Sequence, residues 1–515
     1  MPSTISSKKR GRDSRPLTVA ILLSATIAGC AARTPPALAP PIVSPLSALR
    51  SDLSAIFNAP AFERAIWAAS VRSIESGEAL FELNPTKLMM PASNMKILTL
   101  AAVAERLGWD YTFETTLMTA APVEEGILKG DLIVVGSGDP TIGGRTADTE
   151  NGRLFDQWAE QLLSAGIRTI AGRLIGDDNA FEDEGVEAGW LWDDLAFSYA
   201  APISALTYDS NAVELLVRPG VAAGHSAELL VRPADGGLVV ENHMITSPVG
   251  GDFSFNLRRG PGTNRLTARG AVPLDTPEFA RTVSVDNPTD FFLTALQRTL
   301  AAHGVTVIGS TLDVDTLVSP PDLSKCRVLL SHHSAPLSTL AAPMMKLSLN
   351  LYADTLLKVL GAASVRPGTF QTGRQLEREV LQSWGISPDD VVLSDGSGLS
   401  RYNYVTVDTL VSILAHLAQD PRHATLFAAT LPVAGQDGTL GTRMKGTAAE
   451  GNAHAKTGSQ TGARALSGYV QTRDGEQLAF SMIVNGSNVP ASVLDAAVDQ
   501  AVERLADFSR QGRGK

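Results

Sequence analysis

The sequence contains little cysteine, few aromatic residues and no excess of positive charge. Its two cysteines, Cys30 and Cys326, lie in very different contexts, so no disulfide between them is expected and Cys326 is interpreted as an ordinary thiol. Aromatic residues make up only 6% of the chain, which predicts a mainly aliphatic core. The 43 basic and 54 acidic residues give a net charge of −11, and this balance argues against a basic surface for nucleic acid.

Metal-binding patterns and long hydrophobic runs are also missing. His332 and His333 are adjacent, but no other histidine or cysteine adds a metal-ligand spacing, so the pair is interpreted as loop residues. No metal and no cofactor are therefore expected. No segment approaches the roughly 20 apolar residues that a membrane-spanning helix needs. With 515 residues and 44% hydrophobic content, the chain is long enough for two or three structural units.

The N-terminus has the features of a secretion signal. Basic residues cluster at 8–15, and a short apolar run follows at 17–27. This run leads through two small residues to Cys30, which is similar to the lipobox at which bacterial lipoproteins are cleaved and acylated. An ordinary secretory signal cut at a nearby small residue is the alternative. We expect a signal peptide over residues 1–29, lipidation of Cys30 and a proline-rich tether over residues 30–44.

A lipid anchor at Cys30 places the chain at a membrane surface. Several acyl chains on one cysteine are enough for stable anchoring. In Gram-negative lipoproteins an aspartate directly after the cysteine usually marks retention in the inner membrane, whereas Ala31 and Ala32 follow here. The expected location is the periplasm, with the chain anchored to the outer membrane.

Hydrophobic periodicity predicts an α/β (α+β) protein built from two separated segments. Apolar runs within 67–83 indicate a β-hairpin, and residues 95–107 a strongly apolar helix. Over residues 112–285, short β-like runs punctuated by glycine and proline indicate an inserted β-rich region. The flanking segments 45–111 and 286–515 are expected to form one discontinuous domain. Further helices are expected at 46–56, 289–304, 347–360, 406–418 and 492–508, and a strand pair at 465–471 and 477–484.

Ser93 and Lys96 form a Ser-x-x-Lys motif at the start of the apolar helix. Residues three apart lie on one helical face, so the Lys96 amine can reach the Ser93 hydroxyl. A serine becomes a good nucleophile only when a base takes its proton, and a lysine is a base only if its pKa is lowered. Taken alone, the motif arises often by chance, and a serine that caps a helix explains it equally well.

A second motif is Ser348-x-Asn350. Both side chains can project into one cleft if the segment is a loop. By itself, however, a capping serine followed by a turn asparagine is the simpler interpretation.

The third motif is Lys456-Thr457-Gly458-Ser459, just before a strand-like run. Lys456 offers a cation to a substrate carboxylate, and Thr457 offers a hydroxyl. Gly458 allows a close approach of the backbone, and the N–H of Ser459 is a candidate oxyanion donor.

Together and in this order, the three motifs resemble the signature of penicillin-binding proteins and serine β-lactamases. The long stretch between Ser93 and Ser348 is similar to the class C low-molecular-mass penicillin-binding proteins, the D-alanyl-D-alanine carboxypeptidase/endopeptidase family, which hold additional domains there. The resemblance implies a transpeptidase/β-lactamase-like domain, an antiparallel sheet with helices on both faces, that carries the inserted region. Other segments that resemble the family are 88–93, 136–140, 199–202, 395–401 and 431–440.

The resemblance also implies a role for each motif residue. Ser93 attacks the carbonyl between the last two D-alanines, and Lys96 is the base. Ser348, with Lys456 nearby, passes a proton to the leaving amine. Asn350 binds the amide on the acyl side.

The substrate-binding residues come from the same resemblance. Lys456, Thr457 and Ser397 are candidates for binding the terminal carboxylate. The N–H groups of Ser93 and Ser459 form the oxyanion hole.

Four positions outside the motifs correspond to family residues that contact the diaminopimelate side chain: Asp194, Tyr199, Arg401 and Thr461. Asp194 and Arg401 match the family in type, whereas Tyr199 and Thr461 depart from the commonest residues. A simple surface cation is an equally good interpretation of Arg401.

The expected function is cleavage of peptidoglycan stem peptides and cross-links by a D-Ala-D-Ala carboxypeptidase and DD-endopeptidase, with β-lactams as inhibitors that acylate Ser93. A serine β-lactamase or esterase of the same superfamily is one alternative, although the large insertion argues against it. A non-catalytic wall-binding lipoprotein is another.

Overall fold

The computed structural model describes residues 44–143 and 153–511. The predicted signal peptide and Cys30 lie outside these residues, as does the predicted tether up to residue 43. No helix within the described ranges is long and apolar enough to cross a membrane. Cys326 is a half-buried free thiol, as predicted.

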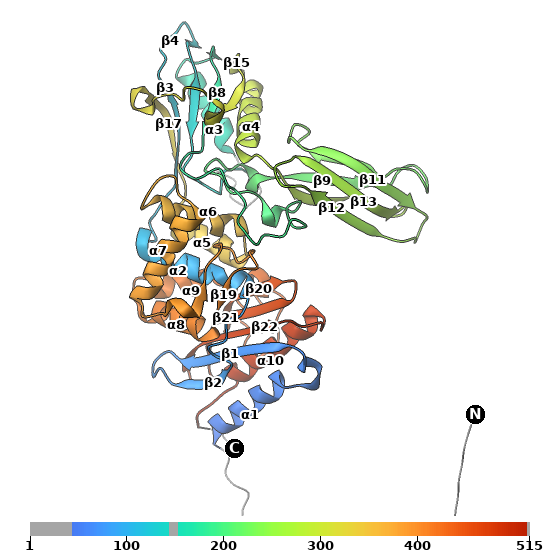
Figure 1. Cartoon of the computed structure of the whole chain (residues 1–515), viewed down its shortest axis with the longest axis vertical. Coiled ribbons are helices and arrows are strands. Elements are labelled where there is room, and N and C mark those ends of the chain that lie inside the picture. Colours follow the sequence, from blue (N-terminus) through green and yellow to red (C-terminus); the bar gives the residue numbers. More distant parts are fainter. Residues whose placement is uncertain (1–43, 144–152, 512–515) are drawn as a thin grey trace, which may run out of the picture. The chain divides into compact units, whose positions relative to one another are not determined.

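A five-stranded antiparallel sheet joins the two ends of the described chain. The strand β1 near the start pairs with β22 near the end, which brings the blue and red parts of Figure 1 side by side. The predicted segments 45–111 and 286–515 thus contribute strands to one sheet. In order across the sheet, the strands are β2 (Ala79–Leu83), β1 (Ile66–Ser73), β22 (Gln477–Asn485), β21 (Ala463–Gln471) and β20 (His454–Gln460).

Helices cover both faces of this sheet, because its central strands are apolar on both sides. In β22, Phe480 and Met482 pack with α1 and α10, whereas Ala479 and Ile483 pack into the core around α2 and α8. The sheet therefore lies between two hydrophobic cores. The helices of this domain are α1 (Pro45–Phe57), α2 (Met95–Leu107), α5 (Leu337–Lys346), α6 (Asn350–Ala362), α7 (Phe370–Ser383), α8 (Val407–Gln419), α9 (Ala424–Thr430) and α10 (Ala491–Ala506).

The described part of the inserted region contains four smaller sheets, two larger hydrophobic cores and one small cluster of Ile133, Ile175 and Val314. One larger core contains residues of α3 (Leu154–Ser164), α4 (Pro288–Ala302), a five-stranded sheet and a four-stranded sheet. The other larger core contains residues of two three-stranded sheets. The five-stranded sheet contains, in order, β16 (Thr311–Asp313), β8 (Leu174–Asp177), β6 (Leu132–Val135), β3 (Glu114–Thr119) and β17 (Arg327–His333). The four-stranded sheet contains, in order, β15 (Thr306–Val307), β7 (Thr169–Ile170), β5 (Ile127–Leu128) and β4 (Val123–Glu124). One three-stranded sheet contains, in order, β10 (Glu228–Arg232), β9 (Ala212–Arg218) and β14 (Phe279–Ser284). The other contains, in order, β11 (Val239–Ser247), β13 (Arg265–Pro273) and β12 (Ser254–Arg259).

The insertion extends beyond its predicted end at residue 285. Strand β17 returns to pair antiparallel with β3, and α4 packs in the same core as α3. Residues 286–333 therefore belong with the inserted sheets and not with the peptidase segment that the sequence predicted from 286 onward. His332 and His333 lie at the end of β17, so their interpretation as loop residues was wrong.

Candidate active site

Ser93 lies in a single 3-10 turn, Ala92–Asn94, that leads into α2. The preceding residue, Ala92, has a φ of 47°, a conformation that is costly for a residue with a Cβ. The next residue, Asn94, is fully buried and ties the turn to the central sheet. Its Nδ2 donates to the carbonyl of Lys456 at 2.9 Å, and its Oδ1 accepts from Ser467 at 2.5 Å. The nucleophile is therefore fixed against strand β20.

Lys96 is fully buried, and its amine contacts three oxygen atoms. The distances from Nζ are 2.7 Å to Asn350 Oδ1, 2.7 Å to the Ser397 carbonyl and 3.1 Å to Ser93 Oγ. The first two atoms can only accept hydrogen bonds, so they take two amine hydrogens. A neutral amine then has only its lone pair left, and this lone pair faces the Ser93 hydroxyl.

The environment of Lys96 makes its neutral form more accessible than that of an exposed lysine. Burial lowers the pKa of Lys96 to about 8, although the nearby carboxyl groups of Asp354 and Asp395 act in the opposite direction. A base whose pKa lies this close to neutrality can both take a proton from Ser93 and return it.

Ser348 lies at a break between α5 and α6. The periodicity predicts one helix over 347–360, but Ser348 has a φ of 61°, and α6 begins only at Asn350. With the chain broken here, the side chains of Ser348 and Asn350 both reach the lysines of the site. Asn350 uses its two amide atoms separately, because Oδ1 accepts from Lys96 while Nδ2 donates to the carbonyl of Tyr199 at 2.8 Å.

The third motif lies on β20, the edge strand of the central sheet. Lys456 is fully buried, and its Nζ donates to Ser348 Oγ at 2.8 Å and to the Thr457 carbonyl at 2.9 Å. Burial, assisted by the charge of Lys96, lowers the pKa of Lys456 well below its usual value. The three motifs thus meet at one place: Lys96 contacts Ser93 and Asn350, and Lys456 contacts Ser348.

Two glycines allow the backbone around Ser93 to pack this closely. A Cβ on Gly458 would lie 2.5 Å from the Pro91 carbonyl oxygen. A Cβ on Gly398 would lie 1.9 Å from the Ala92 carbonyl oxygen, and Gly398 also has a φ of 83°. Both positions therefore require glycine.

The loop between the short strands β18 (Val391–Val392) and β19 (Tyr404–Val405) contacts Lys96 through the Ser397 carbonyl. Asp395 in this loop is fully buried and accepts hydrogen bonds from the loop N–H groups of Gly398 and Ser400. The indole of Trp190, from the inserted region, donates to the same carboxylate at 2.8 Å. The loop that provides the Ser397 carbonyl is thus fixed partly by the insertion.

Ser397 does not have the role that the sequence suggested. Its side chain is fully buried, and its hydroxyl accepts from the N–H of Leu399. Its backbone N–H binds the buried carboxylate of Asp354 at 2.9 Å. The Ser397 hydroxyl is therefore not placed to bind a substrate carboxylate, and its carbonyl instead positions Lys96.

A cavity of about 600 Å³ opens over Ser93 and contains all four residues predicted to contact the substrate side chain. Tyr199 donates from its hydroxyl to Asp194 at 2.8 Å, and Arg401 donates to the carbonyl of Thr461 at 3.2 Å. The structure therefore brings these positions together beside the nucleophile. Motif residues Ser348, Asn350 and Ser459 line the same cavity.

Sequence reasoning missed several residues of the site. Asp354, one helical turn after Asn350, and Trp190 carried no motif that singled them out. Arg464 lines the cavity from the start of β21. Thr439 lies inside the family-like segment 431–440, and its hydroxyl contacts Thr457.

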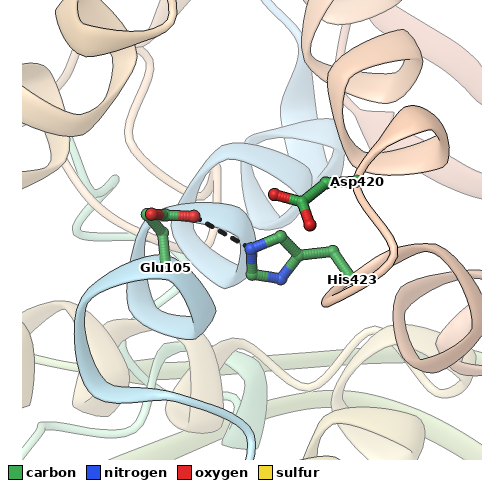
Figure 2. Close-up of side chains that lie close together, drawn as sticks. All are labelled: Glu105, Asp420 and His423. Atoms are coloured by element: carbon green, nitrogen blue, oxygen red, sulfur yellow. Dashed lines mark hydrogen bonds and ion pairs between the residues drawn. The ribbon is translucent and has the colours of Figure 1, made fainter.

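Figure 2 shows a separate cluster, in which His423 lies between Glu105 and Asp420. Their potential ligand atoms lie within 4.8 Å of one another, but all three side chains already have partners. The Trp109 indole donates to His423 Nδ1, so Nε2 carries the hydrogen and donates to Glu105 at 2.9 Å. The Arg422 guanidinium pairs with both carboxylates. The cluster therefore ties the end of α2 to the α8–α9 turn and has no free donor set for a metal ion.

Comparison with known proteins agrees with this geometry. Residues 49–508 match the D-Ala-D-Ala carboxypeptidase 3 (S13) family. The chain is 37% identical over 500 residues to a D-alanyl-D-alanine carboxypeptidase of an Actinomadura species, over 95% of this chain and 89% of that protein. It is 30% identical over 430 residues to the carboxypeptidase DacB of Haemophilus influenzae, over 81% of this chain and 84% of the relative.

Solved structures give the same result. Penicillin-binding protein 4 (dacB) of Haemophilus influenzae matches with a TM-score of 0.79 and 28% identity, over 89% of this chain and 99% of that one. Its complex with a β-lactam matches with a TM-score of 0.71 and 27% identity, over 88% of this chain and 97% of that one. These matches confirm the predicted fold class and the predicted serine-hydrolase character, and the chain belongs to the D-Ala-D-Ala carboxypeptidase 3 (S13) family.

Proposed function

We propose that this chain removes the terminal D-alanine from peptidoglycan stem peptides and also cleaves cross-links between them, through an acyl-enzyme on Ser93. The observation that carries the proposal is the hydrogen bonding of Lys96. Two acceptor-only oxygens bind its amine on one side, and the Ser93 hydroxyl lies on the other. A cross-link presents the same D-Ala carbonyl with a larger amine as the leaving group, so the same acylation step cleaves it.

Acylation begins when Lys96 takes the proton of the Ser93 hydroxyl. The Ser93 oxygen then attacks the carbonyl carbon of the penultimate D-alanine and forms a tetrahedral oxyanion. The N–H groups of Ser93 and Ser459 stabilise this oxyanion, and losing one such donor typically costs about 2.7–4 kcal/mol.

Collapse of the tetrahedral intermediate needs a proton on the leaving amine. Ser348 donates it and is resupplied from Lys456, with which its hydroxyl is hydrogen-bonded. The C–N bond breaks and D-alanine leaves. The proton that Lys96 took from Ser93 then passes to Lys456, so both amines regain their starting states. A water molecule next loses a proton to Lys96 and attacks the Ser93 ester. Lys96 returns this proton to the Ser93 oxygen as the shortened peptide leaves.

The same chemistry accounts for inhibition by β-lactams, whose strained amide acylates Ser93 and is released slowly. We also propose that the chain works in the periplasm, held to the outer membrane through lipidated Cys30. This second proposal rests on the sequence of residues 1–32.

The measurement that tests the proposed reaction is product analysis by mass. Purified protein is incubated with monomeric pentapeptide muropeptides and with cross-linked dimers, and Ser93→Ala is the matched control. The proposal expects loss of one D-alanine from monomers and splitting of dimers by the parent protein alone. If penicillin acylates Ser93 but neither muropeptide changes, the proposal is wrong. Rapid turnover of penicillin would instead favour a β-lactamase.

A further inference from the structure

Two consecutive peptide units of the loop between β18 and β19 are hydrogen-bonded on both sides. The first unit joins Gly396 to Ser397, the second joins Ser397 to Gly398, and both are trans. In a trans peptide unit the C=O and the N–H point in opposite directions. Each unit therefore offers an acceptor to one neighbour and a donor to another, and the orientation of each is fixed when both partners are present.

The second unit is the one that contacts the base. Its C=O, from Ser397, accepts from Lys96 Nζ at 2.7 Å, and its N–H, from Gly398, donates to the Asp395 carboxylate at 2.7 Å. The Lys96 lone pair faces Ser93 because this carbonyl and Asn350 Oδ1 take the other hydrogens of the neutral amine. Rotation of this unit would therefore turn the base away from the nucleophile.

The first unit is held by two residues that the mechanism has not used. Its C=O, from Gly396, accepts from Thr99 Oγ1 at 2.9 Å, whereas the other acceptor near this hydroxyl, the Met95 carbonyl, is 3.4 Å away. Its N–H, from Ser397, donates to Asp354 Oδ1 at 2.9 Å. The same oxygen accepts from the N–H of Gly396 at 2.8 Å. Thr99 and Asp354 are both fully buried.

These two residues lie one helical turn beyond the motif residues. Thr99 follows Lys96 by three positions on α2, and Asp354 follows Asn350 by four positions on α6, so each shares a helical face with its motif residue. The contact of Lys96 with Asn350 is one link between the two helices. The first peptide unit, bound by Thr99 on one side and by Asp354 on the other, is a second link.

Asp354 acts here as a hydrogen-bond acceptor. Its Oδ2 is buried and has no hydrogen-bond partner among the described residues. Burial, assisted by the nearby charge of Asp395, raises the pKa of Asp354 well above its usual value. Both observations favour the neutral acid, whose carbonyl oxygen accepts the two N–H groups. An asparagine side chain offers the same acceptor, which provides a matched substitution.

We propose that Thr99 and Asp354 are positioning residues for the base, because they fix the Gly396–Ser397 peptide unit between α2 and α6 and so keep the Ser397 carbonyl on the Lys96 amine. This inference rests on the proposed function, in which Lys96 activates Ser93. Neither Thr99 nor Asp354 lines the cavity over Ser93. Their loss should therefore slow acylation without weakening the binding that precedes it.

The test separates the binding of benzylpenicillin from acylation. Stopped-flow measurements over a range of benzylpenicillin concentrations give the dissociation constant of the non-covalent complex and the first-order acylation rate. The full-length parent protein is compared with Thr99→Val, Thr99→Ser, Asp354→Leu and Asp354→Asn. Thr355→Val is the control, because Thr355 is also fully buried but its hydroxyl has no hydrogen-bond partner in the described part of the chain.

Thr99→Val is expected to lower the acylation rate about tenfold, because the buried Gly396 carbonyl loses its donor, and to leave the dissociation constant unchanged. Thr99→Ser keeps the hydroxyl and should recover most of the rate. Asp354→Leu, which leaves two N–H groups without an acceptor, should lower the rate roughly 100-fold, whereas Asp354→Asn should stay within about threefold of the parent. Thr355→Val should acylate at the parent rate.

Each variant is also checked by thermal unfolding, and the Thr99 variants decide the test if Asp354→Leu does not fold. Equal acylation rates in Thr99→Val and Thr355→Val overturn the inference, as does a loss that appears only in the dissociation constant. An Asp354→Asn variant as slow as Asp354→Leu overturns the role of Asp354 as an acceptor. All three outcomes leave the proposed function intact. A parent protein that benzylpenicillin does not acylate overturns the proposed function and this inference with it.

Discussion

At the scale of single residues, two buried lysines have separate roles in the site. Each reaches one serine hydroxyl: Lys96 contacts Ser93, and Lys456 contacts Ser348. Both lie in a region that excludes water, and desolvation is the largest cause that lowers their pKa values. Burial therefore makes these amines able to exchange protons with their serine hydroxyls more easily than exposed lysines can.

This environment predicts the pH dependence of acylation. Lys96 has a pKa of about 8, so below that pH it is mostly protonated and cannot take the Ser93 proton. The acylation rate should rise with pH and level off above about pH 8. The check is the second-order rate constant for benzylpenicillin acylation measured across that range, and a flat profile would contradict the assignment of Lys96 as the base. Lys96→Arg, which stays protonated, should lose at least about 100-fold at every pH.

At the scale of secondary-structure elements, three separate segments pack against one another around Ser93. The Ala92–Asn94 turn, strand β20 and the loop between β18 and β19 approach so closely that side chains are excluded at Gly398 and Gly458. A small displacement of any of the three moves the nucleophile relative to its base.

Gly398→Ala should therefore nearly abolish acylation. The new Cβ would lie 1.9 Å from the Ala92 carbonyl oxygen, and the shift needed to relieve this contact displaces Ser93. We expect a loss of about 100-fold in the benzylpenicillin acylation rate. Gly446→Ala is the matched control, because Gly446 has a similar positive φ of 75°. Apart from its chain neighbours, no described residue lies within 4 Å of a Cβ added at Gly446. Equal acylation rates in the two variants would show that close packing at Gly398 does not matter.

The contact between the insertion and the β18–β19 loop gives a second prediction at this scale. Trp190→Phe removes the indole donor from the buried Asp395 carboxylate, which loosens the loop that holds Lys96 through the Ser397 carbonyl. We expect acylation to slow about tenfold, because a buried acceptor loses its partner. Trp192→Phe, at an exposed position, should leave the rate unchanged. If the two variants behave alike, the insertion does not position the loop.

At the scale of the whole molecule, the inserted region takes part in the catalytic site. The Tyr199 carbonyl fixes the amide of Asn350, and Trp190 fixes Asp395. Residues that line the cavity, including Asp194 and Tyr199, also come from the insertion. Removing this region would therefore damage catalysis as well as substrate binding.

The proposed membrane anchor gives a prediction for the whole chain in the cell. Cys30→Ser should abolish lipid labelling and release the protein from the outer-membrane fraction, because stable attachment requires the acyl chains. Cys326→Ser is the control, since that cysteine is a half-buried thiol within the fold. Fractionation with radiolabelled palmitate measures both effects. Retention of unlabelled Cys30→Ser in the membrane would mean that another feature holds the chain there.

The amino-acid sequence by itself determined the local parts of this protein. The three-residue spacing of Ser93 and Lys96, across the 3-10 turn and the first turn of α2, brings the two side chains together wherever this segment packs. The helix over 95–107 and the strands near 465–484 follow from periodicity, because each buries a regular apolar face. Periodicity does not predict α5, which contains Pro343, or the seven-residue α9.

Only the tertiary structure decided which distant residues meet. The insertion ends at β17 because that strand pairs with β3, and strand pairing over such a distance leaves no local signal. The burial of Ser397, the contact of Asn350 with Tyr199 and the pairing of Thr439 with Thr457 arise in the same way. Each depends on packing between segments far apart in the chain, whereas the residues of each motif are close neighbours in the sequence.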